Sequence, residues 1–461
     1  MAVDELHRAR AKLDQLERQE RHLVEKLFEI RKEIEAQKLK IDDLAPPAIN
    51  RLPTELLLHI FTFCIPDPKF PEKSLHRIVG VSRRWRDVVW NNTSFWTSIK
   101  VTQIHRKKSL KMQLKRSRKA LLDIWIEDWS YTPKYVHAKL GALLGTIVPH
   151  ANRWRSLTIN SDSMEMEFVK FILTALNHIS IPFLREFSMN IGDDLDGLPY
   201  PAYPDFLSPI RTPALQHLTL KPSLHLDDFM ALPTLRTLHL TFVEADHSPP
   251  VISMLAPAQL LTSLVLDGDS TGWSLKRNDL HLPLLEDLTL FLNRSVPFLE
   301  AIVAPKLRNV VCYICDPMEF NTITEGKFGD VHDLTLEFWY HVDNRGAESL
   351  CHAFPGARRV QLSVQDTSFF MAGSGVLERQ PPIDQWPKLE TVTLNDLSCQ
   401  WLDRWELDDP IVKWLRGRQE SGLLRRLRVR LPQVKADEDR LPSYYALLGR
   451  YCHLETLTSL M

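Results

Sequence analysis

Several groups of residues have types and spacing that could carry chemistry, but each group is incomplete. Cys312-x-x-Cys315 has the spacing of half a zinc site, yet no second Cys pair and no nearby His completes four ligands. The acidic segment Gly192–Gly197 begins with Gly where a calcium loop needs a carboxylate. The sequence contains no P-loop, no dinucleotide-binding glycine motif, no zinc-protease motif and no nucleophile elbow. We therefore predict no catalytic residue, no metal and no cofactor.

The strongest charge feature is Arg106–Lys119, which holds eight basic residues and no acid. Such a run could act in nuclear import or nucleic-acid binding. The interpretation that we favour is the solvated face of a helix that turns Leu110 and Leu114 inward. The whole chain has 57 Lys and Arg against 58 Asp and Glu, and this net charge of −1 argues against nucleic acid or an anionic membrane as a partner.

The composition indicates a Leu-rich protein without a membrane segment. Leu accounts for 71 of the 461 residues, whereas Gly accounts for only 16. Six Cys in a chain of this length do not make a disulfide framework, so reduced thiols are expected. No apolar run approaches the ~20 residues of a membrane span, and the charged N-terminus does not resemble a secretory signal. We expect a cytoplasmic or nuclear protein, or one present in both compartments.

Residues 1–45 are expected to form one long helix, because they contain no Gly and no Pro. With Leu6 at heptad position a, ten of the twelve a and d positions up to Leu44 are apolar, which is typical of a coiled coil. The two polar positions, Glu20 and Gln37, would lower its stability and help to fix its register. We predict a homodimer through this helix; a helix folded back on its own chain and a solvated charged helix are the alternatives. The predicted seam includes Leu13, Leu16, Leu23, Leu27, Ile30 and Ile34.

Residues 50–101 contain three separated motifs. The motifs are Leu52-Pro53-x-Glu55-Leu56-Leu57-x-x-Ile60-Phe61, then Val81-Ser82-Arg83-Arg84-Trp85-Arg86, then Phe95-Trp96. Together they resemble the F-box, and they are similar in particular to the F-box-like proteins of mushroom-forming fungi, which often carry such an N-terminal helix. A long Pro-rich insert between the first two motifs departs from the family pattern.

The resemblance implies a three-helix F-box domain that binds a small Skp-family adaptor, and through it the cullin and RING subunits of a ubiquitin ligase. A unit of about fifty residues cannot bury so many large apolar side chains internally, so an interface is expected. We favour the core of the module as the location of Trp85, and the core is the alternative for part of the Leu stripe. The resemblance assigns the adaptor-binding surface to Leu52, Pro53, Leu56, Leu57, Ile60, Phe61 and Trp85.

From Leu121 onward one six-residue repeat motif recurs, with apolar residues at its positions 1, 4 and 6. We call each copy of this motif a phrase. Examples are Leu215/Leu218/Leu220 and Leu424/Leu427/Val429, and a last, degraded copy is expected to begin at Leu454. The phrase resembles the core of leucine-rich repeats, in which it forms a short strand. We therefore expect an α/β protein in which a basic linker helix at 102–120 precedes an irregular leucine-rich-repeat solenoid at 121–461. A plain α/β domain is the alternative.

In such an array, positions 3 and 5 of each phrase would face the concave surface that solenoids use for binding. That surface becomes basic toward its C-terminal end, which favours an acidic or phosphorylated segment of a substrate, because Arg pairs bidentately with such groups. The interpretation that we favour is that these are solvated arginines without a ligand. The side chains predicted on this face include His217, His239, Arg359, Arg426 and Arg428.

Three tryptophans, Trp401, Trp405 and Trp414, lie in the longest insert between phrases. Asp409-Pro410 predicts a helix start that would place Trp414 on the inner face of the helix. We expect a core role, and a substrate anchor is the alternative, because Trp is favoured at binding hot spots.

These features together predict a non-catalytic receptor. The F-box would hold the adaptor while the repeats present an unknown protein substrate to the ligase. The alternative is a ligase-independent scaffold, dimerised through residues 1–45, that binds its partner through the repeats.

Overall fold

The fold was examined in a computed structural model. It describes residues 2–44, 49, 52–65, 72–129, 135–161, 166–191, 204–221, 232–242, 251–314, 320, 323, 326–338, 344–363, 367–371, 380–395, 409–421, 427–432 and 441–457. The chain divides into two compact units, Met1–Asn92 and Thr93–Met461. The fold is mixed α/β, with a long N-terminal helix and a parallel sheet.

The first unit is helical. Its helix α1 (Ala2–Leu44) has 43 residues and a length of about 65 Å at 1.5 Å per residue. The three shorter helices are α2 (Thr54–Phe63), α3 (Glu72–Val81) and α4 (Arg83–Asn91), and α4 contacts both of the others. The hydroxyl of Ser82 accepts a hydrogen bond from the Trp85 backbone N–H at 3.1 Å, which caps the start of α4.

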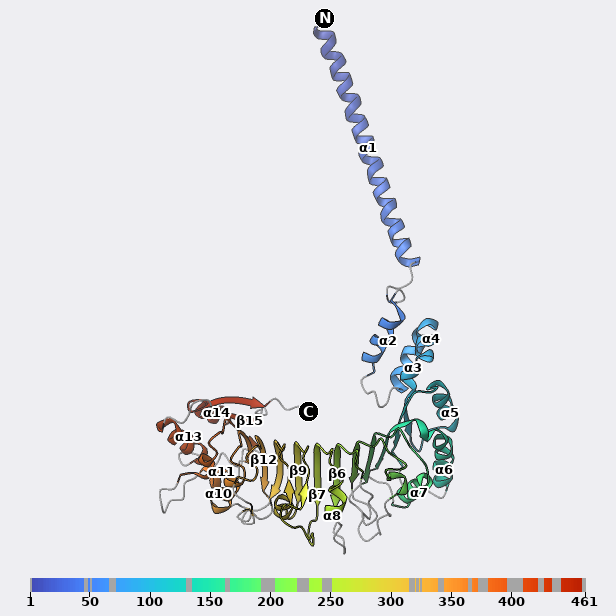
Figure 1. The fold of residues 1–461 in the computed structure, drawn as a ribbon. Coiled ribbons are helices and arrows are strands. Elements are labelled where there is room, and N and C mark those ends of the chain that lie inside the picture. The colour runs from blue at the N-terminus through green and yellow to red at the C-terminus, as the bar shows by residue number, and fades with distance from the viewer. Residues whose placement is uncertain are drawn as a thin grey trace. The chain divides into compact units, whose positions relative to one another are not determined.

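The second unit contains a parallel sheet whose described strands follow one another in chain order (Figure 1). Two further strands, β8 (Leu280–His281) and β10 (Ile302–Val303), form a separate parallel pair. The strands of the large sheet are β1 (Ser98–Val101), β2 (Leu122–Ile126), β3 (Trp154–Ser161), β4 (Glu186–Ile191), β5 (His217–Lys221), β6 (Thr237–Phe242), β7 (Ser263–Gly268), β9 (Asp287–Leu292), β11 (Asn309–Ile314), β12 (Asp333–Phe338), β13 (Arg359–Ser363), β14 (Thr391–Asn395), β15 (Arg428–Pro432) and β16 (His453–Leu457).

Helices and 3-10 turns connect many of these strands, as parallel pairing requires. The helices are α5 (Lys107–Arg116), α6 (Tyr135–Ile147), α7 (Met166–Leu176), α8 (Val251–Leu255), α9 (Val296–Ala301), α10 (Asn344–Ala353), α11 (Thr367–Met371), α13 (Pro410–Glu420) and α14 (Leu441–Leu448). The 3-10 turns are η2 (Thr93–Trp96), η3 (Val148–Arg153), η4 (Asp205–Leu207) and η7 (Pro382–Gln385). In the part of the chain that the structure describes, the helices lack the combination of length and apolar character that a membrane crossing requires.

The strand register aligns the predicted phrases. Leu238 of β6 pairs with Leu264 of β7, and both side chains are buried. Because side chains alternate along a strand, positions 4 and 6 fill the core while positions 3 and 5 face outward. The buried row at position 4 runs through Ile124, Leu157, Phe187, Leu218, Leu238, Leu264, Leu288, Val310, Leu334, Val360 and Val392.

The last two predicted phrases are wrong in register. Val392 of β14 pairs with Val429, so Val429 rather than Leu427 occupies position 4 on β15. Leu454 in turn pairs with Val429 and occupies position 4 on β16, not position 1. Leu427 is itself buried. Apolar character alone therefore could not decide which residue of this segment enters the row.

Candidate functional site

The helices α2 to α4 divide the predicted adaptor-binding residues into two groups. Leu57 and Phe61 are fully buried, and the Phe61 ring centroid lies 4.7 Å from that of Trp85. These rings pack within the helical module, with Trp85 partly buried. The structure thus corrects the prediction at Leu57 and Phe61, which are core residues here, because each is turned about 100° around α2 from the preceding residue, Leu56 or Ile60.

The other predicted residues lie at the surface. Leu56 is 50% exposed, Pro53 is exposed, and Leu52 and Ile60 are partly buried. Phe63 extends this apolar surface with an exposed fraction of 77%, although the sequence analysis did not include it. The signal was present, because Leu56, Ile60 and Phe63 follow the i, i+4, i+7 spacing of one helix face. We call Leu52, Pro53, Leu56, Ile60 and Phe63 the α2 surface.

The second motif of this module holds its helices together. The Leu52 carbonyl accepts a hydrogen bond from Nη2 of Arg84, which connects the start of α2 to α4. Nε of Arg86 donates to the Val79 carbonyl at 3.3 Å, which connects α4 to α3. Arg84 therefore positions the start of the α2 surface, and Arg86 holds α3 against α4.

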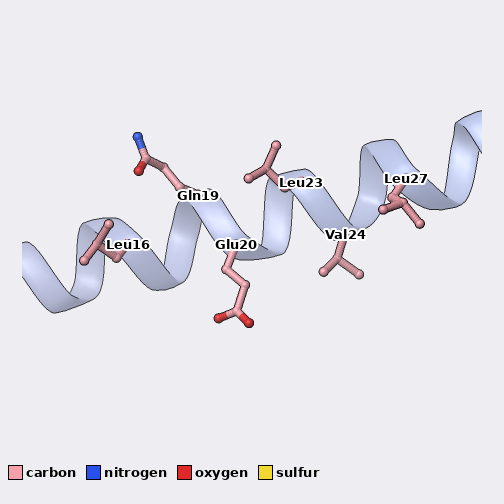
Figure 2. Close-up of a pocket in the computed structure, with 6 residues that line it drawn as sticks. All are labelled: Leu16, Gln19, Glu20, Leu23, Val24 and Leu27. Carbon is pink, nitrogen blue, oxygen red and sulfur yellow. The ribbon is translucent and has the colours of Figure 1, made fainter.

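The helix α1 carries a second candidate site. Each of its six predicted seam residues is between 49% and 64% exposed. Figure 2 shows Leu16, Leu23 and Leu27 along the helix, with Glu20 between Leu16 and Leu23 and Val24 between Leu23 and Leu27. These residues and Gln19 line a shallow groove of about 320 Å³. An apolar stripe of this length gains free energy only when a partner covers it, at roughly 25 cal/mol per Å².

The third candidate site is the outward surface formed by positions 3 and 5 of the strands, which we call the open face. At its N-terminal end lies a hollow of about 400 Å³. Nε of Arg155 donates to Oδ1 of Asp123 at 2.9 Å, and the Ser156 hydroxyl donates to the same oxygen at 2.8 Å. The hydrogen bond to Asp123 raises the pKa of Arg155. The hollow is lined by Asp123, Trp125, Arg155, Ser156, Arg185, Glu186, Gln216 and His217.

Side chains at position 2 also reach this hollow, which the sequence analysis missed. Arg155, Arg185 and Gln216 are second residues of their phrases, and all three line it. A repeated signal was available, because position 2 is arginine in five of the phrases that begin between Leu121 and Leu389. These arginines are Arg155, Arg185, Arg236, Arg308 and Arg358.

The predicted histidines lie on the open face and are partly buried. Nδ1 of His217 lies 2.8 Å from the Thr237 hydroxyl on the neighbouring strand. Burial and, to a lesser degree, the charge of Lys221 lower the pKa of His239 to about 4. His239 is therefore neutral at pH 7 and can offer a hydrogen bond but no charge.

The C-terminal end of the open face is less basic than the sequence indicated. Arg359 forms a two-point ion pair with Asp333 on the neighbouring strand. Glu455 lies 2.8 Å from Arg430 and 3.6 Å from Arg428. Acidic side chains that are distant in sequence thus pair with the described arginines at this end, and one of these acids, Glu455, is shared by Arg428 and Arg430.

Several predicted residues lie outside the described ranges, namely Arg426, Trp401, Trp405, Cys315 and Gly192–Gly197. Trp414 is described and buried, and its Nε1 donates to Asp384 at 3.0 Å. The substrate-anchor alternative is therefore wrong for Trp414.

Cys312 is buried in the core. Within the described ranges, no cluster of three or more His, Cys, Asp or Glu side chains is placed to hold a metal ion.

The family model described as F-box-like matches residues 49–102. The match covers the three motifs and continues beyond Asn92, where the first compact unit ends, through η2 and β1. No curated protein matches the chain. The F-box-like domain suggests an SCF adaptor-type role and implies binding to a Skp-family adaptor.

Proposed function

We propose that the protein is a non-catalytic substrate receptor of an SCF-type cullin-RING ubiquitin ligase. It would belong to the fungal F-box-like proteins with leucine-rich repeats, and it would act in the cytoplasm, the nucleus or both. The observation that carries the proposal is the apolar α2 surface, which is exposed inside the segment that the F-box-like family matches.

The α2 surface has the character of a protein interface. Leu56 and Phe63 expose half or more of their surface, beside the exposed Pro53. Burial of each large apolar side chain against an adaptor would contribute roughly 1.5–3 kcal/mol. The start of α2 is fixed by Arg84, so the surface needs little ordering when it binds.

The open face would bind the substrate. One strand per phrase, parallel pairing in chain order and buried positions 4 and 6 support a leucine-rich-repeat solenoid. Catalysis by the assembly would then be proximity, because a bound substrate presents its lysines at high effective concentration to the conjugating enzyme.

Adaptor binding can be tested with the double substitution L52A/P53A in the full-length chain. We expect it to abolish recovery of a Skp-family adaptor in a pull-down, since it removes apolar contacts but leaves the Leu52 carbonyl in place. The matched control is I104A/I210A, which truncates two residues that are 88% and 85% exposed in the second unit. Unchanged adaptor recovery by L52A/P53A would contradict the proposal.

A second candidate function is a ligase-independent dimeric scaffold, and the exposed stripe of α1 favours it. Residues 1–45 would form a parallel or antiparallel homodimeric coil, and the open face would bind the partner. Co-purification separates the two functions. Recovery of adaptor together with cullin supports the ligase receptor, whereas recovery of adaptor without cullin supports the scaffold.

A further inference from the structure

The basic segment Arg106–Lys119 has no part in the proposed function, yet the structure places it at a groove. Helices α5 and α6 contact each other in the second unit (Figure 1). Lys107, Lys111 and Lys115 follow one another at successive turns of α5 and line a groove of about 430 Å³. The remaining lining residues are Leu114, Gly145, Thr146, Pro149 and His150. We call this the lysine groove.

The part of the chain around the lysine groove has a large excess of positive charge. Residues 93–161 contain 13 Lys and Arg but only three acids. Each of these acids already has a basic partner, in the pairs Asp123–Arg155, Glu127–Lys100 and Asp128–Lys100. Among the residues that the structure describes, the ammonium groups of Lys107, Lys111 and Lys115 have no hydrogen-bond or ion-pair partner.

Neighbouring basic side chains are engaged in the fold, in contrast to these lysines. The Arg116 guanidinium lies 4.5 Å from the Trp96 ring centroid, and burial lowers its pKa. Nη2 of Arg153 donates to the Ser117 hydroxyl at 2.7 Å. Burial and then the charge of Arg153 lower the pKa of His150, so this ring is neutral at pH 7. The positive charge that lines the groove at pH 7 therefore comes from the lysines.

We propose that the lysine groove binds an extended acidic segment of a protein partner. Residues four apart on a helix are separated by about 6 Å along its axis. Alternate residues of an extended chain project from the same side about 6.6 Å apart. Carboxylates at every second residue of a bound segment would therefore meet Lys107, Lys111 and Lys115 in turn.

The groove lining favours a peptide over a nucleic acid. Leu114 and Pro149 supply apolar surface, and Gly145 has open space beside its backbone. Single-stranded nucleic acids are bound on aromatic stacking platforms, but no Phe, Tyr or Trp lines the groove among the described residues. This interaction surface is separate from the α2 surface and the open face, so the inference does not rest on the proposed function.

The inference can be tested with the full-length chain and a fluorescein-labelled peptide of alternating Glu and Ser, by fluorescence anisotropy at low ionic strength. We expect binding of this peptide and no binding when Gln replaces every Glu. The triple variant K107Q/K111Q/K115Q should bind about tenfold more weakly, at about 0.5 kcal/mol per exposed ion pair. The matched control R106Q/K108Q/K119Q removes the same charge outside the groove and should weaken binding by less than about twofold.

Three results would overturn the inference. The first is absence of binding by the Glu peptide at low ionic strength. The second is an equal loss of affinity in the two triple variants, which would indicate general charge attraction. The third is tighter binding of a single-stranded or duplex oligonucleotide that depends on the same three lysines. The single variant K111Q, with an expected loss of about twofold, gives the same comparison if the triple variant is poorly folded.

Discussion

Regularly spaced leucines occur in both compact units, but the two units use them in opposite ways. In Thr93–Met461, phrase leucines such as Leu238 and Leu264 are buried in a continuous core. In Met1–Asn92, Leu23 and Leu56 lie on helices and are 64% and 50% exposed. A regular apolar pattern therefore predicts burial, but it does not predict whether the covering surface belongs to the same chain.

The difference follows from the geometry of the elements. A strand in the sheet has a neighbour on each side, so each phrase covers part of the next. A single helix with a narrow apolar stripe covers nothing by itself and needs a second element. Replacement of a strand leucine in the sheet should therefore lower the stability of the fold. Replacement of an exposed helix leucine should instead weaken association with a partner.

The largest expected effect is on the stability of the second unit. L264A removes a fully buried side chain from the row at position 4. It should lower the free energy of unfolding by about 3 kcal/mol, through lost apolar transfer and a cavity. Denaturant unfolding measures this change, and L260A, at a site 45% exposed, is the matched control with an expected loss below about 0.5 kcal/mol. Equal losses of unfolding free energy in L264A and L260A would contradict the distinction between buried strand leucines and exposed leucines.

Adjacent leucines of α2 allow a sharper test within one helix. L56A should weaken adaptor binding by about 2 kcal/mol, roughly thirtyfold, while it changes stability little. L57A should instead destabilise the first unit, because Leu57 is fully buried. Calorimetric titration with a Skp-family adaptor and denaturant unfolding separate the two effects. A loss of adaptor affinity in L57A alone, with stability intact, would reverse our assignment of the two faces.

A smaller effect is expected in α1. Glu20 occupies a predicted a position of the seam, where a charged side chain opposes burial. E20L should strengthen dimerisation of the full-length chain by about 1 kcal/mol, roughly fivefold, as measured by sedimentation equilibrium. E29L, outside the a and d positions, should give no such gain. A chain that stays monomeric with E20L would contradict the homodimer.

The smallest expected effect concerns a polar side chain beside the leucine core. The pKa of His239 is about 4 in the folded chain and about 6.5 when unfolded. The unfolded state therefore binds more protons between these values, so stability rises with pH across this window and falls as pH drops. H239Q should reduce the difference in free energy of unfolding between high and low pH by about 1 kcal/mol, after allowance for solvent screening of a partly exposed group. Unfolding at pH 4.5 and pH 7.5 measures it, with the exposed His281 replaced by Gln as control.

Much of the fold could be predicted because it depends on local periodicity. The heptads predicted α1, and the phrase predicted the paired strands from β2 to β14. The last two phrases failed because β15 and its preceding segment offer apolar residues in two registers, including Leu427 and Val429. Only pairing with β14 selects one of them.

The candidate sites were less predictable, because they depend on contacts between distant segments. Leu56 and Leu57 are identical in type, and the position of α4 determines which one is covered. The sequence predicts Arg359 as a basic residue of the open face, yet Asp333 from the preceding strand neutralises it. Among the described residues, Lys111 has no ion-pair partner, and its groove forms only when α6 packs beside α5.

The chain-order pairing of the sheet has a consequence for the history of the protein. Each described strand of the large sheet pairs only with the strands of that sheet that come before and after it in the chain. A gene duplication or deletion of one phrase would therefore lengthen or shorten the array without changing the pairing of the remaining strands. Selection could adjust the area of the open face in steps of one phrase while the F-box-like segment kept its own sequence.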